Sequence, residues 1–312
     1  NDQALREIIS SDKNGIKYAI REMSLVDWLI LFDPTVGRKS IYDLPLSRYF
    51  GSPMGVMAAR TGWNDGVDSP DVVAMMKLGE YNFDNHHHKD AGNFILWYKG
   101  PLATESGIYQ DGASYGTEPH MSYTKQSIAH NTMLVYDPEE DSANFYNGVN
   151  DGGQRGVGGY RFFNDFINSD TKTAEILAHE IDSSNGKQPA YTYLKGDLTN
   201  AYSDKVKEFK RSFMFLNLFD DEVPAALIVF DKVTSSKPEF KKSWLLHGQT
   251  YPEINNGRST WFSSGYTNDS GYTYQGKMIV DTLLPSVDNL QTNVVGGPQE
   301  GWCVINGIDY NH

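Results

Sequence analysis

The sequence predicts a mainly β protein, a large antiparallel β-sandwich preceded by a short helical segment. Short apolar runs bounded by Gly, Asn, Asp and Pro recur from Tyr49 onward, which is typical of sandwich strands. Apolar residues at helical spacing occur only in the first part of the chain, up to about residue 32. With 312 residues and 39% hydrophobic content, the chain can bury a full core.

The N-terminal segment has broken apolar stripes and ends in the run Trp28 to Phe32, before Asp33-Pro34. Proline after an apolar run is a common helix stop. We expect helices here that either pack on the sandwich or belong to a larger helical domain, because they are too few to form a domain alone.

Five later segments predict strands: 94–98, 132–136, 209–218, 225–231 and 242–247. Each combines apolar and β-branched or aromatic residues with turn residues at its ends. We expect the last three to be consecutive strands of one sheet. The glycine-rich segment 147–160 predicts a mobile loop at a binding cleft, with a solvated hairpin as the alternative.

Charge and composition exclude some classes of function. The formal charge of −13 argues against general nucleic-acid binding, so a polyanionic ligand needs a local basic patch. No apolar run approaches the ~18 residues of a membrane span. The single cysteine, Cys303, excludes an internal disulfide and is expected to be a buried apolar residue.

Three of the eight histidines are adjacent, at positions 86, 87 and 88. In an extended strand, His86, His88 and Asp90 project to one face and His87 to the other. Imidazoles clustered beside carboxylates are candidates for a functional site.

Later segments add Glu105 and His130 to this cluster. Two histidines and one carboxylate from separate segments suit a tetrahedral zinc with water as the fourth ligand. The residue types alone leave a hydrogen-bonded surface cluster open as the alternative.

Several motifs resemble those of the heparinase II/III-like polysaccharide lyases, and its heparinase II branch in particular. The resemblance extends over roughly residues 26–247. It rests on an HxHxD element at 86–90, a D-x-G-like element at 105–107, the HN pair at 130–131, and downstream strands at 211–214, 229–233 and 244–247.

The resemblance implies a structural zinc held by His88, Glu105 and His130, with His86 turned toward the substrate. The family usually has Asp where this chain has Glu105, so this ligand is longer by one methylene. The zinc organises the substrate-facing loops and so supports His86.

The activity implied is β-elimination at a uronic acid, with heparin or heparan sulfate favoured and alginate or another uronate polymer next. His86 and Tyr115 are the expected catalytic residues, with Tyr123 as the second choice for the tyrosine. Among basic side chains near the site, Arg155 is the expected substrate contact. The others are Lys89, Lys125 and Arg161, and His120 and His247 are expected to be structural.

By the same resemblance, residues 1–45 are the last helices of an incomplete (α/α) toroid, and 46–312 a heparinase II/III-like β-sandwich that is truncated at its end. A complete protein is expected to carry the rest of the toroid upstream, with further catalytic residues. The implied partners are an acidic polysaccharide and, in some assemblies, a second copy in a homodimer. The implied location is periplasmic or secreted.

Two other functions stay open. One is a non-catalytic carbohydrate-binding or scaffold sandwich that lacks a complete active site. The other is a hydrolytic metal site in which zinc-bound water is the nucleophile.

Overall fold

The computed structural model describes residues 40–64, 66, 68–83, 86–107, 115–117, 120–141, 144, 149–156, 171–265 and 273–296, and the backbone of two short strands within 304–309. The helices expected in residues 1–32 and the cysteine at 303 lie outside these ranges. Among the described residues, no helix has the length and apolarity that a bilayer crossing requires.

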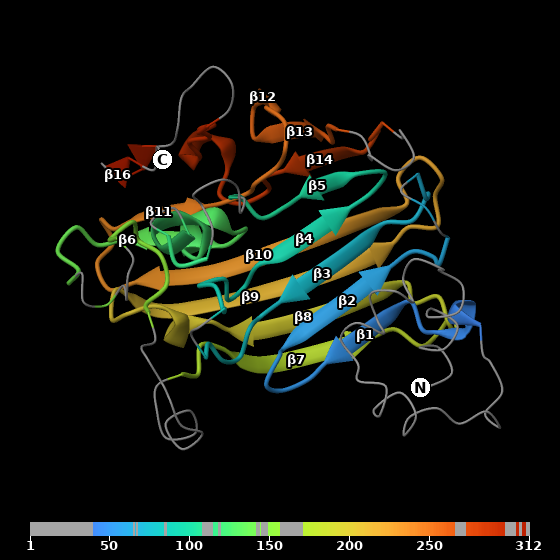
Figure 1. The fold of residues 1–312 in the computed structure, drawn as a ribbon, viewed down its shortest axis with the longest axis horizontal. Helices are drawn as coiled ribbons and strands as arrows, with labels where there is room; N and C mark the ends of the chain where they lie inside the picture. Colours follow the sequence, from blue (N-terminus) through green and yellow to red (C-terminus); the bar gives the residue numbers. More distant parts are fainter. Residues whose placement is uncertain are drawn as a thin grey trace.

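Two antiparallel sheets dominate the fold, and Figure 1 shows one lying over the other. In each sheet, neighbouring strands are consecutive in the sequence, so both are meanders. The five-stranded sheet has the order β1 (Ser47–Phe50), β2 (Val56–Arg60), β3 (Val73–Lys77), β4 (Phe94–Trp97) and β5 (Pro101–Ala103). The four-stranded sheet has the order β10 (Ala225–Ser235), β9 (Val206–Asn217), β8 (Tyr191–Asp197) and β7 (Glu175–Ile181).

The core lies between these two sheets. Burial alternates along β2, β8 and β9, because successive side chains of a strand point to opposite faces. Met57 and Met76 from one sheet are fully buried in the same cluster as Leu194 and Phe213 from the other. The rings of Phe94 and Phe213 meet across the interface at 6.0 Å. Burying one such side chain contributes roughly 1.5–3 kcal/mol, so this interface is the main source of stability. The predicted sandwich is confirmed.

Smaller elements flank the two main sheets. The remaining elements are η1 (Ile41–Asp43), η2 (His120–Thr124), η3 (Ser127–Ala129), β6 (Met133–Tyr136), η5 (Thr199–Ala201), β11 (Lys241–Trp244), β12 (Glu253–Asn255), β13 (Arg258–Phe262), β14 (Lys277–Asp281), η6 (Val287–Asn289), β15 (Val304–Ile305) and β16 (Ile308–Asp309).

The expectation that the last three predicted strands share one sheet is wrong for the third. β9 and β10 pair with each other, but β11 pairs with β6 in a separate two-stranded sheet. After β10 the chain turns at Ser236, whose amide bonds the carbonyl of Lys205, and Phe240 enters the core. This turn redirects the chain away from the edge of β10. The pairing places the end of β11 beside the segment that precedes β6.

The glycine-rich segment is described only at 149–156, and this part is anchored. Residues 151–154 are buried. Gly152 has a φ of +92°, and a Cβ there would come within 3.0 Å of the backbone of Tyr136. The glycine therefore permits a close approach of this segment to β6.

Candidate metal centre

The three adjacent histidines lie in the loop between β3 and β4, where we expected an extended strand. Residues 86–93, the part of this loop that carries the histidines, form no ladder with a neighbouring strand. Some of its backbone groups bond to side chains, and others bond to the backbone of Leu78 and Lys125. Gln154 exchanges two hydrogen bonds with the backbone of Ala91, at 3.0 and 2.7 Å, and the Ser127 hydroxyl donates to the carbonyl of Lys89. Because side chains from distant segments satisfy these groups, the loop keeps a fixed irregular path.

The three histidine side chains make separate contacts in this loop. The His86 ring stacks on Tyr115 with centroids 4.4 Å apart. His87 accepts a hydrogen bond from the backbone amide of Phe83 through its Nδ1 atom. The His88 ring lies 5.1 Å from that of His130.

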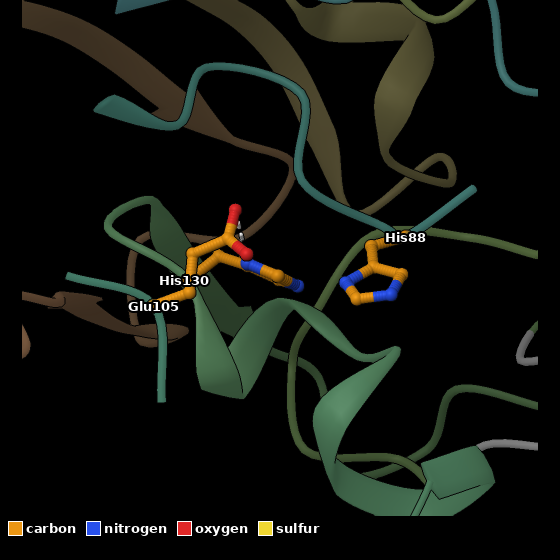
Figure 2. Close-up of side chains that lie close together, drawn as sticks. All are labelled: His88, Glu105 and His130. Carbon is orange, nitrogen blue, oxygen red and sulfur yellow. Dashed lines mark ion pairs between the residues drawn. The ribbon is translucent and has the colours of Figure 1, made fainter. Parts of the chain in front are cut away.

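His88, Glu105 and His130 come together from three segments, as Figure 2 shows. One ligand atom from each lies within 4.8 Å of the others. Glu105 follows β5, and His130 caps the 3-10 helix η3 just before β6, rather than lying in the strand. The structure therefore brings together the three residues that the resemblance implied.

Distances and burial in this trio fit a cation. His130 Nδ1 and Glu105 Oε1 are 3.4 Å apart, longer than an ordinary hydrogen bond. Two ligands of a tetrahedral zinc with bonds near 2.1 Å are also about 3.4 Å apart. His130 is fully buried, and among the described residues neither of its ring nitrogens has a hydrogen-bond partner. A buried polar group without a partner is costly, and a metal ion at this point would supply one.

Protonation in the trio also suits a metal. Burial, followed by the charge of His130, lowers the pKa of His88 to about 4. Contact with His130 lowers the pKa of Glu105, although burial acts in the opposite direction. At neutral pH, His88 is therefore a neutral imidazole and Glu105 a carboxylate, the forms that bind metals.

Asp90 has a different role from the one its position on the histidine face indicated. Its carboxylate binds the ammonium of Lys77 on β3, with N–O distances of 2.7 and 2.6 Å. Burial alone would raise the pKa of Asp90, but the ion pair with Lys77, together with His130 and His88, outweighs it and the pKa is lowered. Asp90 is thus committed to fixing the loop onto β3.

The expected catalytic pair lies on the exposed side of the trio. His86 is exposed, and Tyr115 is 49% exposed. The ring of Tyr115 also lies 4.8 Å from that of buried His120, which in turn lies 6.3 Å from His88. A continuous set of rings thus leads from the surface to the trio.

Other residues named from the sequence have contacts of their own. The hydroxyl of Tyr123 bonds that of Ser106 at 2.8 Å, and His120 accepts a hydrogen bond from the amide of Gly116. The backbone amide of His247 donates to Asn131 Oδ1. Burial, then the charge of His130, lowers the pKa of His247 to about 4.

The basic residues lie in varied surroundings. Arg155 donates to the backbone carbonyls of Asn200 and Lys172, and it lines a cavity of about 380 Å³. Lys89 and Lys125 are buried, and position 161 lies outside the described residues. The cavity is also lined by Asp137, Glu140, Asn144, Ser203, Asp204, Lys205 and Ser236.

Sequence reasoning missed the residues that hold the trio in place. Asn93, Asn131 and Arg211 are all fully buried. Asn131 and Arg211 lie within motifs that carried the resemblance, but their contacts join segments far apart in the chain. The one signal available in the sequence was the residue type, because a polar side chain that becomes buried needs hydrogen-bond partners.

The fold and the site together define a β-sandwich with a candidate His-Glu-His metal centre at one end of its sheets. The sequence profile of the Heparinase II/III-like, C-terminal family matches residues 52–277, and the chain belongs to this family. No curated protein sequence matches the chain.

Similar solved structures include heparan sulfate lyase HepC from Pedobacter heparinus and a mutant of the same enzyme. The first has a TM-score of 0.47 and 15% identity, over 84% of this chain and 33% of that chain. The mutant has a TM-score of 0.47 and 14% identity, over 84% and 32%. The chain spans about a third of the length of these enzymes.

Proposed function

We propose that this chain forms the β-sandwich part of a polysaccharide lyase that cleaves a uronic-acid-containing glycan by β-elimination. The observation that carries the proposal is the exposed His86–Tyr115 stack, 4.4 Å between centroids, beside the His88, Glu105 and His130 trio. Family membership supports the same reaction class. Heparin or heparan sulfate is the favoured substrate, because the motifs of this chain resemble those of the heparinase II branch, and alginate or another uronate polymer comes next.

The elimination needs three groups at the uronate. A base removes the C5 proton, a donor stabilises the negative charge that builds on the carboxylate, and an acid protonates the O4 leaving group as the C4–O4 bond breaks. His86 suits the base or the carboxylate donor, because imidazole accepts or donates near neutral pH. Tyr115 suits proton transfer to the leaving oxygen. Stacking holds the two rings in one arrangement, so both groups can face one sugar.

We propose Zn²⁺ as the ion of the trio, with His88, Glu105 and His130 as its ligands. Two imidazoles with one carboxylate suit zinc better than calcium or magnesium, which prefer oxygen alone. When bound, the ion would hold the three segments together in a structural role. His86 would then depend on this centre through His88, two residues away in the same loop.

Arg155 remains a proposed substrate contact, but the charges around it limit the direction from which an acidic glycan can approach. Three carboxylates, Asp137, Glu140 and Asp204, line the same cavity. They repel an acidic glycan, so a sulfate or carboxylate would have to approach Arg155 from the side away from them.

The proposal extends to the whole protein. Residues 1–45 would be the last helices of an (α/α) toroid that supplies the other wall of the cleft and further catalytic residues. The complete enzyme would be periplasmic or secreted and could form a homodimer.

The test is the ultraviolet absorbance of the unsaturated product, measured with the longest natural chain that carries these residues. Heparan sulfate, heparin, alginate and hyaluronan serve as substrates. We expect absorbance to rise with at least one of them, and His86→Ala to abolish it while zinc content stays at the wild-type level. No product from any uronate polymer would overturn the lyase proposal in favour of a non-catalytic glycan-binding sandwich. Loss of zinc in His86→Ala would move His86 into the ligand set.

A further inference from the structure

Asn93 lies in the loop between β3 and β4, directly before β4, and is fully buried. Its backbone is fixed at both ends. The amide donates to the carbonyl of Asp90, and the carbonyl accepts from the amide of Lys77. The side chain therefore starts from a rigid point, five residues after His88.

Both polar atoms of the Asn93 side chain bond to ligand segments of the candidate metal centre. Nδ2 donates to Glu105 Oε1 at 2.8 Å, and Oδ1 accepts from the backbone amide of Asn131 at 2.9 Å. Glu105 Oε1 is also the oxygen that lies 3.4 Å from His130 Nδ1. One amide group thus joins the Glu105 carboxylate to the residue that follows His130.

We propose that Asn93 is a positioning residue that fixes the Glu105 carboxylate as a metal ligand. This inference rests on the zinc site of the proposed function and adds to it a residue outside the ligand set. The Glu105 side chain is 40% exposed and has three rotatable bonds. Without a donor on Oε1, the carboxylate would turn toward solvent, and ordering it on metal binding would cost conformational entropy.

The chemistry of asparagine is required at this position. Its amide donates to a carboxylate and accepts from a backbone amide at the same time. Aspartate has the same shape and keeps the acceptor for Asn131, but it cannot donate to Glu105 and places a second negative charge beside it. Leucine can do neither.

Asn131, the residue after His130, has further contacts besides its bond to Asn93. The Asn131 carbonyl accepts from Arg211 Nη1 at 2.9 Å. The Asn131 side-chain Nδ2 donates to the carbonyls of Phe94 and Thr104, at 2.7 and 2.9 Å. These three partners hold Asn131 and its neighbour His130 without Asn93, so changes at Asn93 should act on the centre mainly through Glu105.

The experiment measures zinc affinity in the full chain by competition with a chromophoric chelator, together with the thermal midpoint of the metal-free protein. Asn93→Asp is the main variant and Asn93→Leu the second. Asn217→Asp is the matched control, because Asn217 is a buried asparagine on β9 whose Oδ1 accepts a backbone hydrogen bond from Phe219. Near-ultraviolet circular dichroism checks that each variant is folded.

We expect Asn93→Asp and Asn93→Leu to weaken zinc binding about 10- to 100-fold, as is typical when a residue that orients a ligand is removed. Asn217→Asp should change the thermal midpoint and leave zinc affinity at the wild-type value. Wild-type affinity in a folded Asn93 variant would overturn this inference alone. Absence of zinc uptake by the wild type would overturn the zinc site and this inference with it. Loss of the fold in both variants would make Asn93 a core residue and would also overturn it.

Discussion

At the scale of single residues, this chain buries polar groups whose partners come from distant segments. Tyr202, at the end of η5, is 3% exposed and donates its hydroxyl to the carbonyl of Met133 on β6. Burial is the main cause that raises the pKa of Tyr202 to about 12. The folded state therefore keeps the Tyr202 proton at pH values where the unfolded chain has already lost it.

Stability should therefore fall in a defined alkaline window because of Tyr202. Its unfolded pKa is about 10, so between pH 10 and 12 the unfolded state has lost the proton and the folded state still holds it. The free energy of unfolding therefore falls as the pH rises, by up to about 3 kcal/mol across the window. We expect Tyr202→Phe to be less stable than wild type at pH 8 and to show a shallower loss from pH 10 upward. Urea unfolding at pH 8, 10 and 11 measures this, and parallel losses in the two proteins would contradict it.

The residues of the centre differ in how far the sequence could identify them. The grouping of His88, Glu105 and His130 was predictable from the motifs that carry them, because the order of these motifs along the chain can be read from the sequence. Asn93 was not, since an asparagine before a strand is as common in turns as in cores. Its role depends on a contact with Glu105, twelve residues away, that only the fold creates.

At the scale of elements, β9 reaches into the loops of the candidate centre through one side chain. Arg211 is fully buried and forms a bidentate pair with Asp231 on β10, at 2.7 and 2.6 Å. Its Nη1 donates to the carbonyls of Gly92 and Asn131. The four-stranded sheet is thus tied to both loops that carry the histidines.

Replacing Arg211 by Met should destabilise the protein by about 3–5 kcal/mol, because Asp231, whose side chain is only 10% exposed, is left without its partner. The double variant Arg211→Met/Asp231→Leu should recover part of that loss. Urea unfolding measures both. Arg258→Met serves as the control, since Arg258 forms a similar bidentate pair with Asp281 that is exposed, and we expect little change there. A double variant as unstable as Arg211→Met would contradict the argument.

The elements themselves were predicted well where the apolar runs are long. The runs at 94–98, 132–136, 209–218 and 225–231 correspond to β4, β6, β9 and β10. Pairing was predicted less well, because a run such as 242–247 does not encode which edge it joins. The extended strand expected at 86–90 was wrong for a related reason, since the bonds with Gln154 and Ser127 determine its path.

At the scale of the whole molecule, the candidate centre lies where three segments from different elements meet. His88 belongs to the five-stranded sheet's β3–β4 loop, Glu105 follows β5, and His130 leads into β6, which pairs with β11. An ion bound by all three would stabilise the folded state over the unfolded one by mass action.

Removing zinc should therefore lower the thermal midpoint of the whole protein. At free zinc 1,000-fold above the dissociation constant, binding contributes about 4 kcal/mol, which for a chain of this size is a shift on the order of 10 °C. Calorimetry with and without a chelator measures it. His88→Ala should lose both the zinc and the shift, whereas His87→Ala, its exposed neighbour in the sequence, should keep both. An unchanged midpoint in chelator would contradict a structural role for the ion.

The contacts of Arg211 also bear on the order of folding. The contact with Gly92 spans 119 residues and the contact with Asn131 spans 80. Contacts between residues so far apart in the sequence slow folding, because the entropy of closing the loop is lost before the contact stabilises the chain, and we expect them to form late. The two loops that carry the histidines gain their final support only when β9 docks. Metal binding at this centre is therefore expected among the last events of folding. The rate of zinc uptake during refolding would then report when the native topology forms.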